Sequence, residues 1–227
     1  MASSGSAFVE TRWLLRIAVG CAGVMTLLAA ARLFGFRSDP PSPKNGPPRA
    51  VAVQHWDDVV GGGHRLGPAE APVVIVEFVD FECPYCRGYA LETLPAIQAS
   101  YPTEVTVVAR HFPLRYHRFA EMSAVASICA DRQGRFRAMY DLLYGVQDSL
   151  GLLRWRVLAE RSGVPDLDSW GECRDDPGVR AVVAADLELG KRIGATGTPT
   201  ILVNGWRYER PLQEAELRTV IDSILSR

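Results

Sequence analysis

Two kinds of hydrophobic pattern alternate along the chain beyond residue 50. Residues 73–81 read VVIVEFVDF, a continuous β-branched and aromatic run that predicts a strand buried on both faces. Residues 105–109, VTVVA, predict a second strand. Between these strands, apolar residues suited to one helix follow at Tyr89, Leu91, Leu94 and Ile97. Strand, helix and strand in this order predict a right-handed βαβ unit with parallel strands.

Strand patterns disappear between about residues 112 and 193, and helical patterns take their place. Apolar residues recur at helical spacing in four segments, Phe119–Cys129, Phe136–Leu143, Leu152–Leu158 and Val179–Gly190. Strands return at Thr200–Val203 and Trp206–Glu209, which flank the two-residue hairpin turn Asn204-Gly205. An amphipathic helix is expected over Leu217–Leu225. The whole pattern predicts an α/β fold, in which a helical insertion separates a βαβ unit from a ββα unit.

The first 36 residues have a different pattern. An apolar stretch runs from Leu14 to Phe36, and its charge-free centre, Ile17–Ala31, has 15 residues. A membrane-spanning helix needs roughly 20 residues, so this centre spans a bilayer only if the flanking arginines reach the interfaces. Because apolar residues resume at Leu33, we expect an uncleaved membrane helix, with a cleaved signal peptide as the alternative.

Residues 37–50 are rich in proline and predict an extended linker. The chain is thus expected to divide into a cytoplasmic tail and membrane helix over residues 1–36, this linker, and a folded domain over residues 51–227. At the start of the folded domain, Val51–Val60 favours an edge strand or a short helix. Gly61–Gly63 then predicts a turn.

Composition narrows the class of protein. With 48% apolar and 22% charged residues, the 227-residue chain has the composition of an ordinary folded protein, which excludes disorder. Its net charge of −1 provides no general positive field for a nucleic-acid backbone, so we expect no nucleic-acid partner. No residue pattern supports a metal, a nucleotide or another cofactor.

Four of the five cysteines lie in the folded domain, and two of these carry a chemical signal. Cys83-Pro84-Tyr85-Cys86 follows the first predicted strand and opens the next helix. At a helix N-terminus, unpaired N–H groups and the helix dipole favour a thiolate, so Cys83 is the expected nucleophile. Cys86 lies one turn deeper, close enough to form a disulfide with Cys83 and to expel a bound substrate.

A zinc half-site and an inert bridge are the alternatives for this pair. Structural zinc takes four ligands, whereas the histidines of the chain are single and scattered. A disulfide that closes so short a loop adds little stability. A redox-active dithiol is therefore the favoured interpretation.

A second motif stands far downstream of the cysteines, TGTPTILVNG at residues 196–205. Together with EFVDFECPYC at residues 77–86, it makes the chain from about Val51 to the C-terminus resemble the membrane-tethered or exported DsbA-like thiol-disulfide oxidoreductases of the thioredoxin superfamily. The resemblance implies a thioredoxin fold in which Pro199 is cis beside the cysteines and the backbone of Thr198 pairs with an extended substrate chain. Pro84 and Tyr85 are then expected to tune the reactivity of the two cysteines and to contact substrate.

The resemblance assigns roles to three further residues. Glu77 matches the buried acid of the family, where desolvation raises the pKa of a carboxyl and lets it relay the proton of the resolving thiol. The alternative for Glu77 is a tolerated charge on a strand edge. A structural disulfide between Cys129 and Cys173 is expected from some family members, and two buried free thiols are the alternative. Such a bridge indicates an oxidising compartment.

The function implied by the resemblance is donation of disulfides to unfolded or reduced exported proteins, through a mixed disulfide at Cys83. A membrane redox partner, quinone-linked or related to vitamin K epoxide reductase, would restore the disulfide of the enzyme. A reductase or isomerase of the same fold and a non-catalytic peptide-binding chaperone are the alternatives. We expect a monomer anchored by its N-terminus with the folded domain outside the cytoplasm, or a secreted protein if the N-terminal segment is cleaved.

Overall fold

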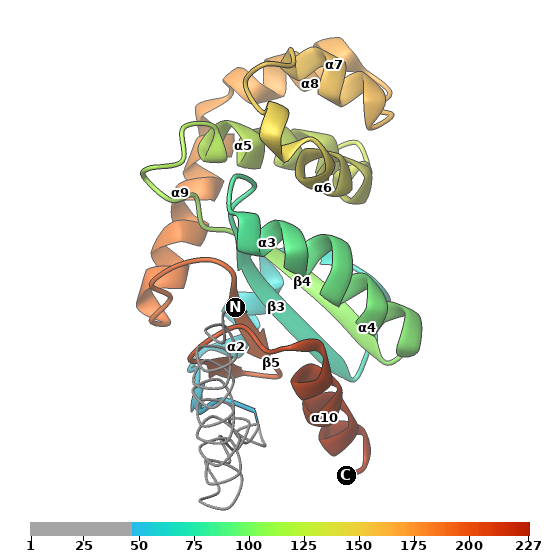
Figure 1. Ribbon diagram of the computed structural model, residues 1–227. Coiled ribbons are helices and arrows are strands. Elements are labelled where there is room, and N and C mark those ends of the chain that lie inside the picture. The colour runs from blue at the N-terminus through green and yellow to red at the C-terminus, as the bar shows by residue number, and fades with distance from the viewer. Residues whose placement is uncertain (1–46) are drawn as a thin grey trace, which may run out of the picture. The chain divides into compact units, whose positions relative to one another are not determined.

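The computed structural model describes residues 47–227, which are organised around a six-stranded sheet (Figure 1). The strand order is β1-β6-β5-β3-β4-β2. The strands are β1 (Ala50–Ala52), β2 (His64–Leu66), β3 (Val73–Val79), β4 (Val105–His111), β5 (Thr200–Val203) and β6 (Trp206–Tyr208). β3 and β4 are parallel, and the other neighbouring pairs of this sheet are antiparallel.

The predicted membrane helix and nearly all of the proline-rich linker lie outside the described residues. Among the helices of residues 47–227, none combines the length and the apolar character that crossing a bilayer requires. The N-terminal segment therefore stays a prediction from the sequence.

β3 is a central strand that is buried along almost its whole length. Its register places Glu77 opposite Ala109 of β4 on one side and Ile201 of β5 on the other. A strand covered on both faces needs apolar residues at consecutive positions, which explains the lack of alternation in the sequence. The strand ends at Val79, two residues before the predicted end, because the chain turns there towards the first helix.

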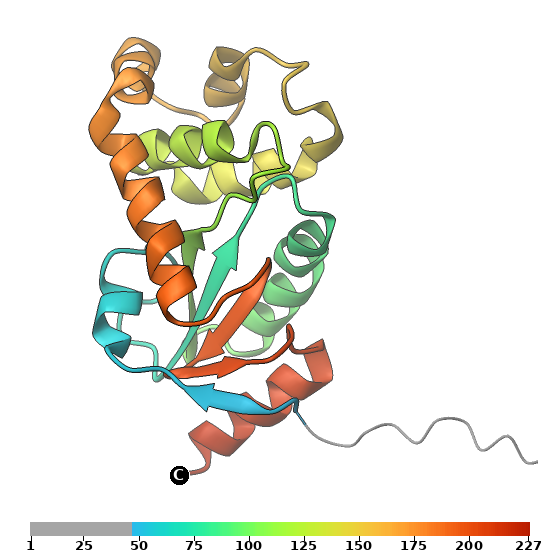
Figure 2. The same ribbon diagram turned by 90° about the vertical axis from the view of Figure 1, so that its left-hand side faces the viewer.

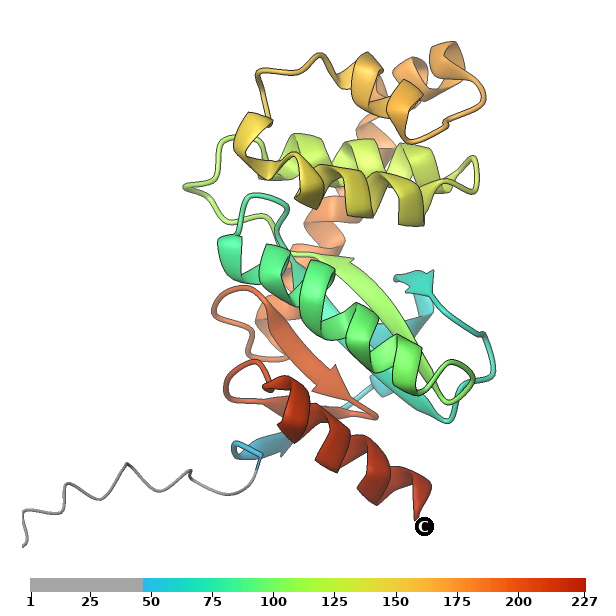
Figure 3. The same ribbon diagram turned by 45° about the vertical axis from the view of Figure 1, so that its right-hand side comes forward.

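Helices cover both faces of the sheet, as the two views in Figures 2 and 3 show. One face carries α3 (Pro84–Gly88), η1 (Tyr89–Thr93), α4 (Leu94–Ser100) and α10 (Glu214–Leu225). The other face carries α2 (Trp56–Gly61) and α9 (Pro177–Arg192). η1 is a π-helix that joins α3 to α4, so the single helix predicted between the two long strands is interrupted by a wider turn.

The helical insertion connects β4 to β5 and lies beyond the carboxyl end of β3 (Figure 1). Before α9 it contains α5 (Ala120–Asp131), α6 (Phe136–Gly145), η2 (Gln147–Ser149), α7 (Trp155–Arg161) and α8 (Leu167–Asp175). The predicted βαβ unit, insertion and ββα unit are therefore all present.

Several local predictions need correction. Leu152 is 83% exposed in a turn, so the third predicted helix of the insertion begins at Trp155. α8 has no counterpart among the predictions because Trp170 is its single buried residue, which leaves no periodic signal. Val51–Val60 holds both a strand and a helix, and β2 is unpredicted because three residues are too few to show alternation.

The hairpin between β5 and β6 forms as predicted. Asn204 and Gly205 both have positive φ, at 42° and 85°, which suits the type of turn that joins twisted antiparallel strands in two residues. Asn204 Oδ1 also accepts a hydrogen bond from the N–H of Val74 at 2.7 Å, which ties the hairpin to the start of β3.

Cys129 on α5 and Cys173 on α8 form a disulfide in the structure, with Cα atoms 5.8 Å apart. The bridge holds α8 to the buried centre of the insertion, since Cys129 is 1% exposed.

Removing this bridge is expected to lower the free energy of unfolding by about 4 kcal/mol, because the bridge closes a loop between residues 44 positions apart. The variant carries Cys129→Ala and Cys173→Ala, and urea unfolding is compared with the parent protein, both in a Cys86→Ala background so that no second bridge forms. Addition of a reducing agent should destabilise the parent and leave the variant unchanged. Equal stability of the two proteins before reduction would contradict the prediction.

Candidate active site

Cys83 lies where the chain leaves β3 and enters α3. It is the N-cap of α3, and Pro84 occupies the first turn, where a missing N–H has no intrahelical partner. Cys86 follows one turn deeper, and both residues are free thiols. The exposed fraction is 4% for Cys83 and 0% for Cys86. Both cysteines are buried, and Cys83 is the more exposed of the two, as expected for the nucleophile.

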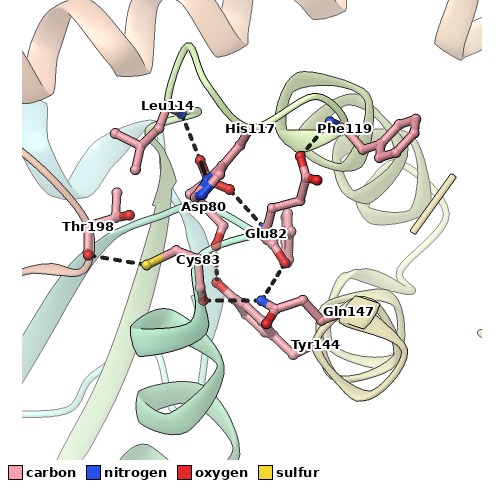
Figure 4. A network of polar contacts seen from close by, with 10 residues as sticks. Asp80, Glu82, Cys83, Leu114, His117, Phe119, Tyr144, Gln147 and Thr198 are labelled. Carbon is pink, nitrogen blue, oxygen red and sulfur yellow. Dashed lines mark hydrogen bonds and ion pairs between the residues drawn. The ribbon is translucent and has the colours of Figure 1, made fainter. Parts of the chain in front are cut away.

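The loop between α9 and β5 brings Thr198 and Pro199 to this sulfur. The Thr198–Pro199 peptide bond is cis, as the resemblance implies. In its protonated form, Cys83 donates a hydrogen bond of 3.3 Å from Sγ to the carbonyl oxygen of Thr198 (Figure 4). The two sequence motifs, far apart in the chain, thus meet at the reacting atom.

The surroundings shift the pKa values of the two cysteines in opposite directions. The pKa of Cys83 is lowered to about 5, chiefly by the hydrogen bond from the Cys86 thiol. The backbone N–H groups of Tyr85 and Cys86 act in the same direction, and together these hydrogen bonds outweigh the opposing effect of burial. Burial raises the pKa of Cys86 well above its ordinary value, and the neighbouring Cys83 adds to the shift. The reduced site therefore holds a thiolate at Cys83 and a thiol at Cys86 in neutral solution.

A groove of about 600 Å³ lies beside the cysteines. Pro84 and Tyr85 line it together with Thr198 and Pro199, so the residues expected to contact substrate share one surface. Tyr85 is 79% exposed, which leaves its ring free to pack against a bound chain. The volume falls within the range of ordinary ligand-binding clefts and suits a short extended segment of polypeptide.

Glu77 is fully buried on β3, a central strand, and so does not lie at a strand edge. The hydroxyl of Tyr140, on α6 of the insertion, donates a short hydrogen bond to Oε1 of Glu77. Burial raises the pKa of Glu77 to about 7, while the hydrogen bond from Tyr140 and the charge of Arg137 act in the opposite direction. A carboxyl that titrates near neutrality can both give and take a proton at working pH.

Glu77→Gln is expected to stabilise the protein above neutral pH and to flatten the fall of stability between about pH 4.5 and 7. The pKa of Glu77 is raised from 4.5 to about 7 by folding, so the folded state binds more protons in this window and the free energy of unfolding falls as pH rises. Across this window the free energy of unfolding of the wild type falls by about 3 kcal/mol. Glutamine does not titrate, so the variant lacks this fall.

This pH dependence is measured by urea unfolding of the wild type and the variant at about pH 4 and about pH 8. Glu92→Gln, at an exposed position on η1, is the matched control and should leave the fall in place. A difference between wild type and Glu77→Gln that is the same at both pH values would contradict the prediction.

Asp80 is a buried acid that the sequence does not single out as functional. Its Oδ1 accepts the N–H of Glu82 at 2.8 Å, and its Oδ2 accepts the N–H of Leu114 at 2.7 Å and lies 2.9 Å from Nδ1 of His117 (Figure 4). These contacts join the turn before Cys83 to the segment after β4. The one signal in the sequence is a second acid at the end of the apolar strand run.

The helical insertion also contacts the backbone of the site. Nε2 of Gln147, on η2, donates to the carbonyl oxygens of Phe81 at 2.7 Å and Cys83 at 3.1 Å (Figure 4). The Glu82 carboxylate accepts the backbone N–H of Phe119, just before α5. Since these bonds depend on the packing of distant segments, no local pattern marks them in the sequence.

Within residues 47–227, no three His, Cys, Asp or Glu side chains are grouped as a metal site would need. A free dithiol with an acidic first cysteine, together with a buried carboxyl that titrates near neutrality, is suited to thiol-disulfide exchange.

Comparison of the sequence with known proteins gives a family match and several curated relatives. A family model described as thioredoxin matches residues 60–223. Among curated proteins, the Na⁺/H⁺ antiporter NhaA 3 of Salinispora tropica is 40% identical over 164 residues, which are 70% of this chain and 24% of that protein. NhaA 1 of Salinispora arenicola is 38% identical over 146 residues, 64% of this chain and 22% of that protein. The chain thus spans about a quarter of the length of these relatives.

Solved structures share the fold. Oxidised BdbD from Bacillus subtilis superposes with a TM-score of 0.67 at 22% identity, over 80% of this chain and 100% of that one. A thioredoxin-like oxidoreductase from Silicibacter pomeroyi gives a TM-score of 0.65 at 25% identity, over 75% of this chain and 98% of that one. α-DsbA1 from Wolbachia pipientis gives 0.61 at 20% identity, over 72% and 91%. The chain therefore belongs to the thioredoxin family, and its fold is that of the DsbA-like thiol-disulfide oxidoreductases.

Proposed function

We propose that the protein is a thiol-disulfide oxidase that donates its Cys83–Cys86 disulfide to unfolded or reduced exported proteins. The observation that carries this proposal is the position of Cys83, which caps the N-terminus of α3 and contacts the carbonyl oxygen of Thr198 beside cis Pro199; these surroundings lower the pKa of Cys83 to about 5. A thiolate stabilised in the reduced form makes the disulfide form relatively unfavourable, and such a disulfide is a good oxidant.

Each exchange begins on the oxidised enzyme. A thiolate of the substrate attacks Sγ of Cys83, so the bond between Cys83 and Cys86 breaks as a mixed disulfide forms. Cys86 leaves as a thiolate and takes a proton from Glu77, since a buried charged sulfur is unfavourable. The second substrate thiolate then attacks the substrate sulfur of the mixed disulfide and displaces Cys83 as a thiolate. The substrate loses two electrons and the enzyme gains them.

The groove beside Pro199 supports a polypeptide substrate. The Thr198 carbonyl meets the Cys83 sulfur, so an extended chain that pairs with this backbone would bring its own sulfur to the reacting atom. We further propose an oxidising, extracytoplasmic location, supported by the Cys129–Cys173 disulfide, and reoxidation by a quinone-linked or vitamin K epoxide reductase-like membrane protein. Ion exchange belongs to the names of much longer relatives and forms no part of this proposal.

The proposal is tested by the equilibrium potential of the Cys83–Cys86 pair, measured on the full-length protein in glutathione buffers with Cys83→Ser as the control. We expect a potential above about −150 mV, towards the strongly oxidising members of the superfamily. A potential near the roughly −270 mV of thioredoxin would make the protein a reductase and overturn the proposed direction of electron flow. Unimpaired function of the Cys83→Ser variant would instead favour the peptide-binding chaperone.

A further inference from the structure

Near Cys86, the insertion and the sheet share a buried polar contact whose donor lies outside both sequence motifs. Tyr140 on α6 is 2% exposed and Glu77 on β3 is 0% exposed, so both polar groups are removed from water. The Tyr140 hydroxyl donates to Oε1 of Glu77, while Oε2 has no hydrogen-bond partner among residues 47–227. Tyr140 is therefore the one side chain of the described structure that donates a hydrogen bond to this carboxyl.

A donor in this position favours one protonation state of the acid. A hydroxyl that donates to a carboxyl oxygen stabilises the carboxylate more than the carboxylic acid, and in a buried site the bond is not weakened by competing water. Tyr140 thus opposes the effect of burial, which favours the neutral acid. The contact also fixes which oxygen of Glu77 is occupied and leaves Oε2 free to exchange a proton.

We propose that Tyr140 is a positioning residue of the dithiol site, whose hydroxyl orients the Glu77 carboxyl and favours its ionised form during proton exchange with Cys86. This inference rests on the proposed function, in which Glu77 carries the proton of Cys86. It gives the helical insertion a part in the chemistry, because α6 supplies the donor.

Other titratable or charged groups surround the pair from several elements. They are Cys86 on α3, Tyr89 on η1, Arg137, Asp141 and Tyr144 on α6, Asp80 after β3 and Glu216 on α10. Tyr140 alone among them donates a hydrogen bond to Glu77. Tyr144 has an equally buried hydroxyl one turn along the same helix, but it lies 3.5 Å from the carbonyl oxygen of Asp80 instead. Tyr144→Phe is therefore the matched control for Tyr140→Phe.

The proton step is isolated by the reaction of the reduced protein with 5,5′-dithiobis(2-nitrobenzoate). In the first phase the Cys83 thiolate attacks the reagent disulfide, forms a mixed disulfide and releases one thionitrobenzoate. In the second phase Cys86 gives its proton to Glu77, attacks Sγ of Cys83 and releases the second thionitrobenzoate. The enzyme loses two electrons to the reagent, and both releases are followed by absorbance in stopped flow. A Cys21→Ala background removes the remaining thiol.

In the wild type, the second-phase rate should rise with pH around a midpoint near 7. In Tyr140→Phe the midpoint should move upward by about one to two pH units, which is the effect of losing one hydrogen bond to a charged group. The second phase near neutral pH should then slow by about five- to fiftyfold, with the first phase unchanged. Tyr144→Phe should keep the wild-type midpoint.

An unshifted midpoint in Tyr140→Phe, or an equal shift in Tyr144→Phe, would overturn the role of Tyr140. Glu77→Gln separates this failure from failure of the proposed function. Loss of the midpoint in Glu77→Gln supports Glu77 as the proton carrier, whereas its persistence there would overturn that role and the inference with it. If Tyr140→Phe does not fold, Tyr140→Leu removes the same hydroxyl, and the Glu77 carboxyl is titrated directly by 13C NMR in that variant; a raised midpoint is expected, and a wild-type midpoint would overturn the role.

Discussion

Cys83→Ser is expected to reduce disulfide exchange with a dithiol peptide by about a thousandfold or more, because the hydroxyl cannot form the mixed disulfide on which the exchange depends. Cys86→Ser should behave differently. Cys83 then still forms the mixed disulfide with an oxidised peptide, but no resolving thiol attacks it. The variant should therefore accumulate a covalent complex with the peptide, which a small-molecule thiol releases.

Both outcomes are read by mass spectrometry of the intact protein after incubation with an oxidised peptide, with the Cys129–Cys173 disulfide left in place. The covalent adduct should map to Cys83 in Cys86→Ser and be absent from Cys83→Ser. The difference in exposure and acidity between the two sulfurs is the reason for this asymmetry. An adduct on Cys86 in the Cys83→Ser protein would show that the roles of the two cysteines have been assigned in reverse.

The elements that the sequence predicts well are those with a strong local pattern. The run that forms β3 is apolar at consecutive positions because both faces of the strand are covered, and the Asn204-Gly205 turn has backbone angles that favour these two residues. The position of the Cys83–Cys86 motif is likewise predictable, because the motif lies between the end of a predicted strand and the start of a predicted helix. Local pattern is thus enough to predict the frame and the nucleophile.

The contacts that complete the site depend instead on the packing of distant segments. Tyr140 reaches Glu77 only because α6 lies against the end of the sheet, and Gln147 reaches the Cys83 carbonyl from η2. Neither side chain belongs to a motif, and a tyrosine at an apolar position of an amphipathic helix reads as ordinary core. The position of Pro199 beside Cys83 was expected from family resemblance, because a loop 115 residues away in the chain has no local link to the cysteines.

The second large effect is expected in the pH dependence of the reduced site. With a pKa of about 5, Cys83 should be a thiolate in about hundredfold excess over the thiol at neutral pH. Alkylation by iodoacetamide should therefore be fast and nearly independent of pH above about 6, and the thiolate absorbance near 240 nm should titrate with the same midpoint. Cys86→Ala should raise the midpoint, because the Cys86 thiol provides the largest stabilising hydrogen bond. A midpoint near 9 in the wild type would contradict the assignment.

The same acidity determines how the potential varies with pH. Above pH 5, reduction of the Cys83–Cys86 disulfide adds two electrons but one proton, since Cys83 remains a thiolate and the proton goes to the buried site at Cys86 and Glu77. The potential should then fall by about 30 mV per pH unit, whereas a dithiol with both sulfurs protonated would give about 59 mV per pH unit.

The stability of the reduced protein follows from the same pKa. The reduced protein gains stability relative to the oxidised protein as pH rises from about 5 towards 9, the window between the folded and ordinary pKa values of Cys83. A slope of about 59 mV per pH unit around neutrality would mean that Cys83 is protonated there, and would remove the physical basis for an oxidising disulfide at this site.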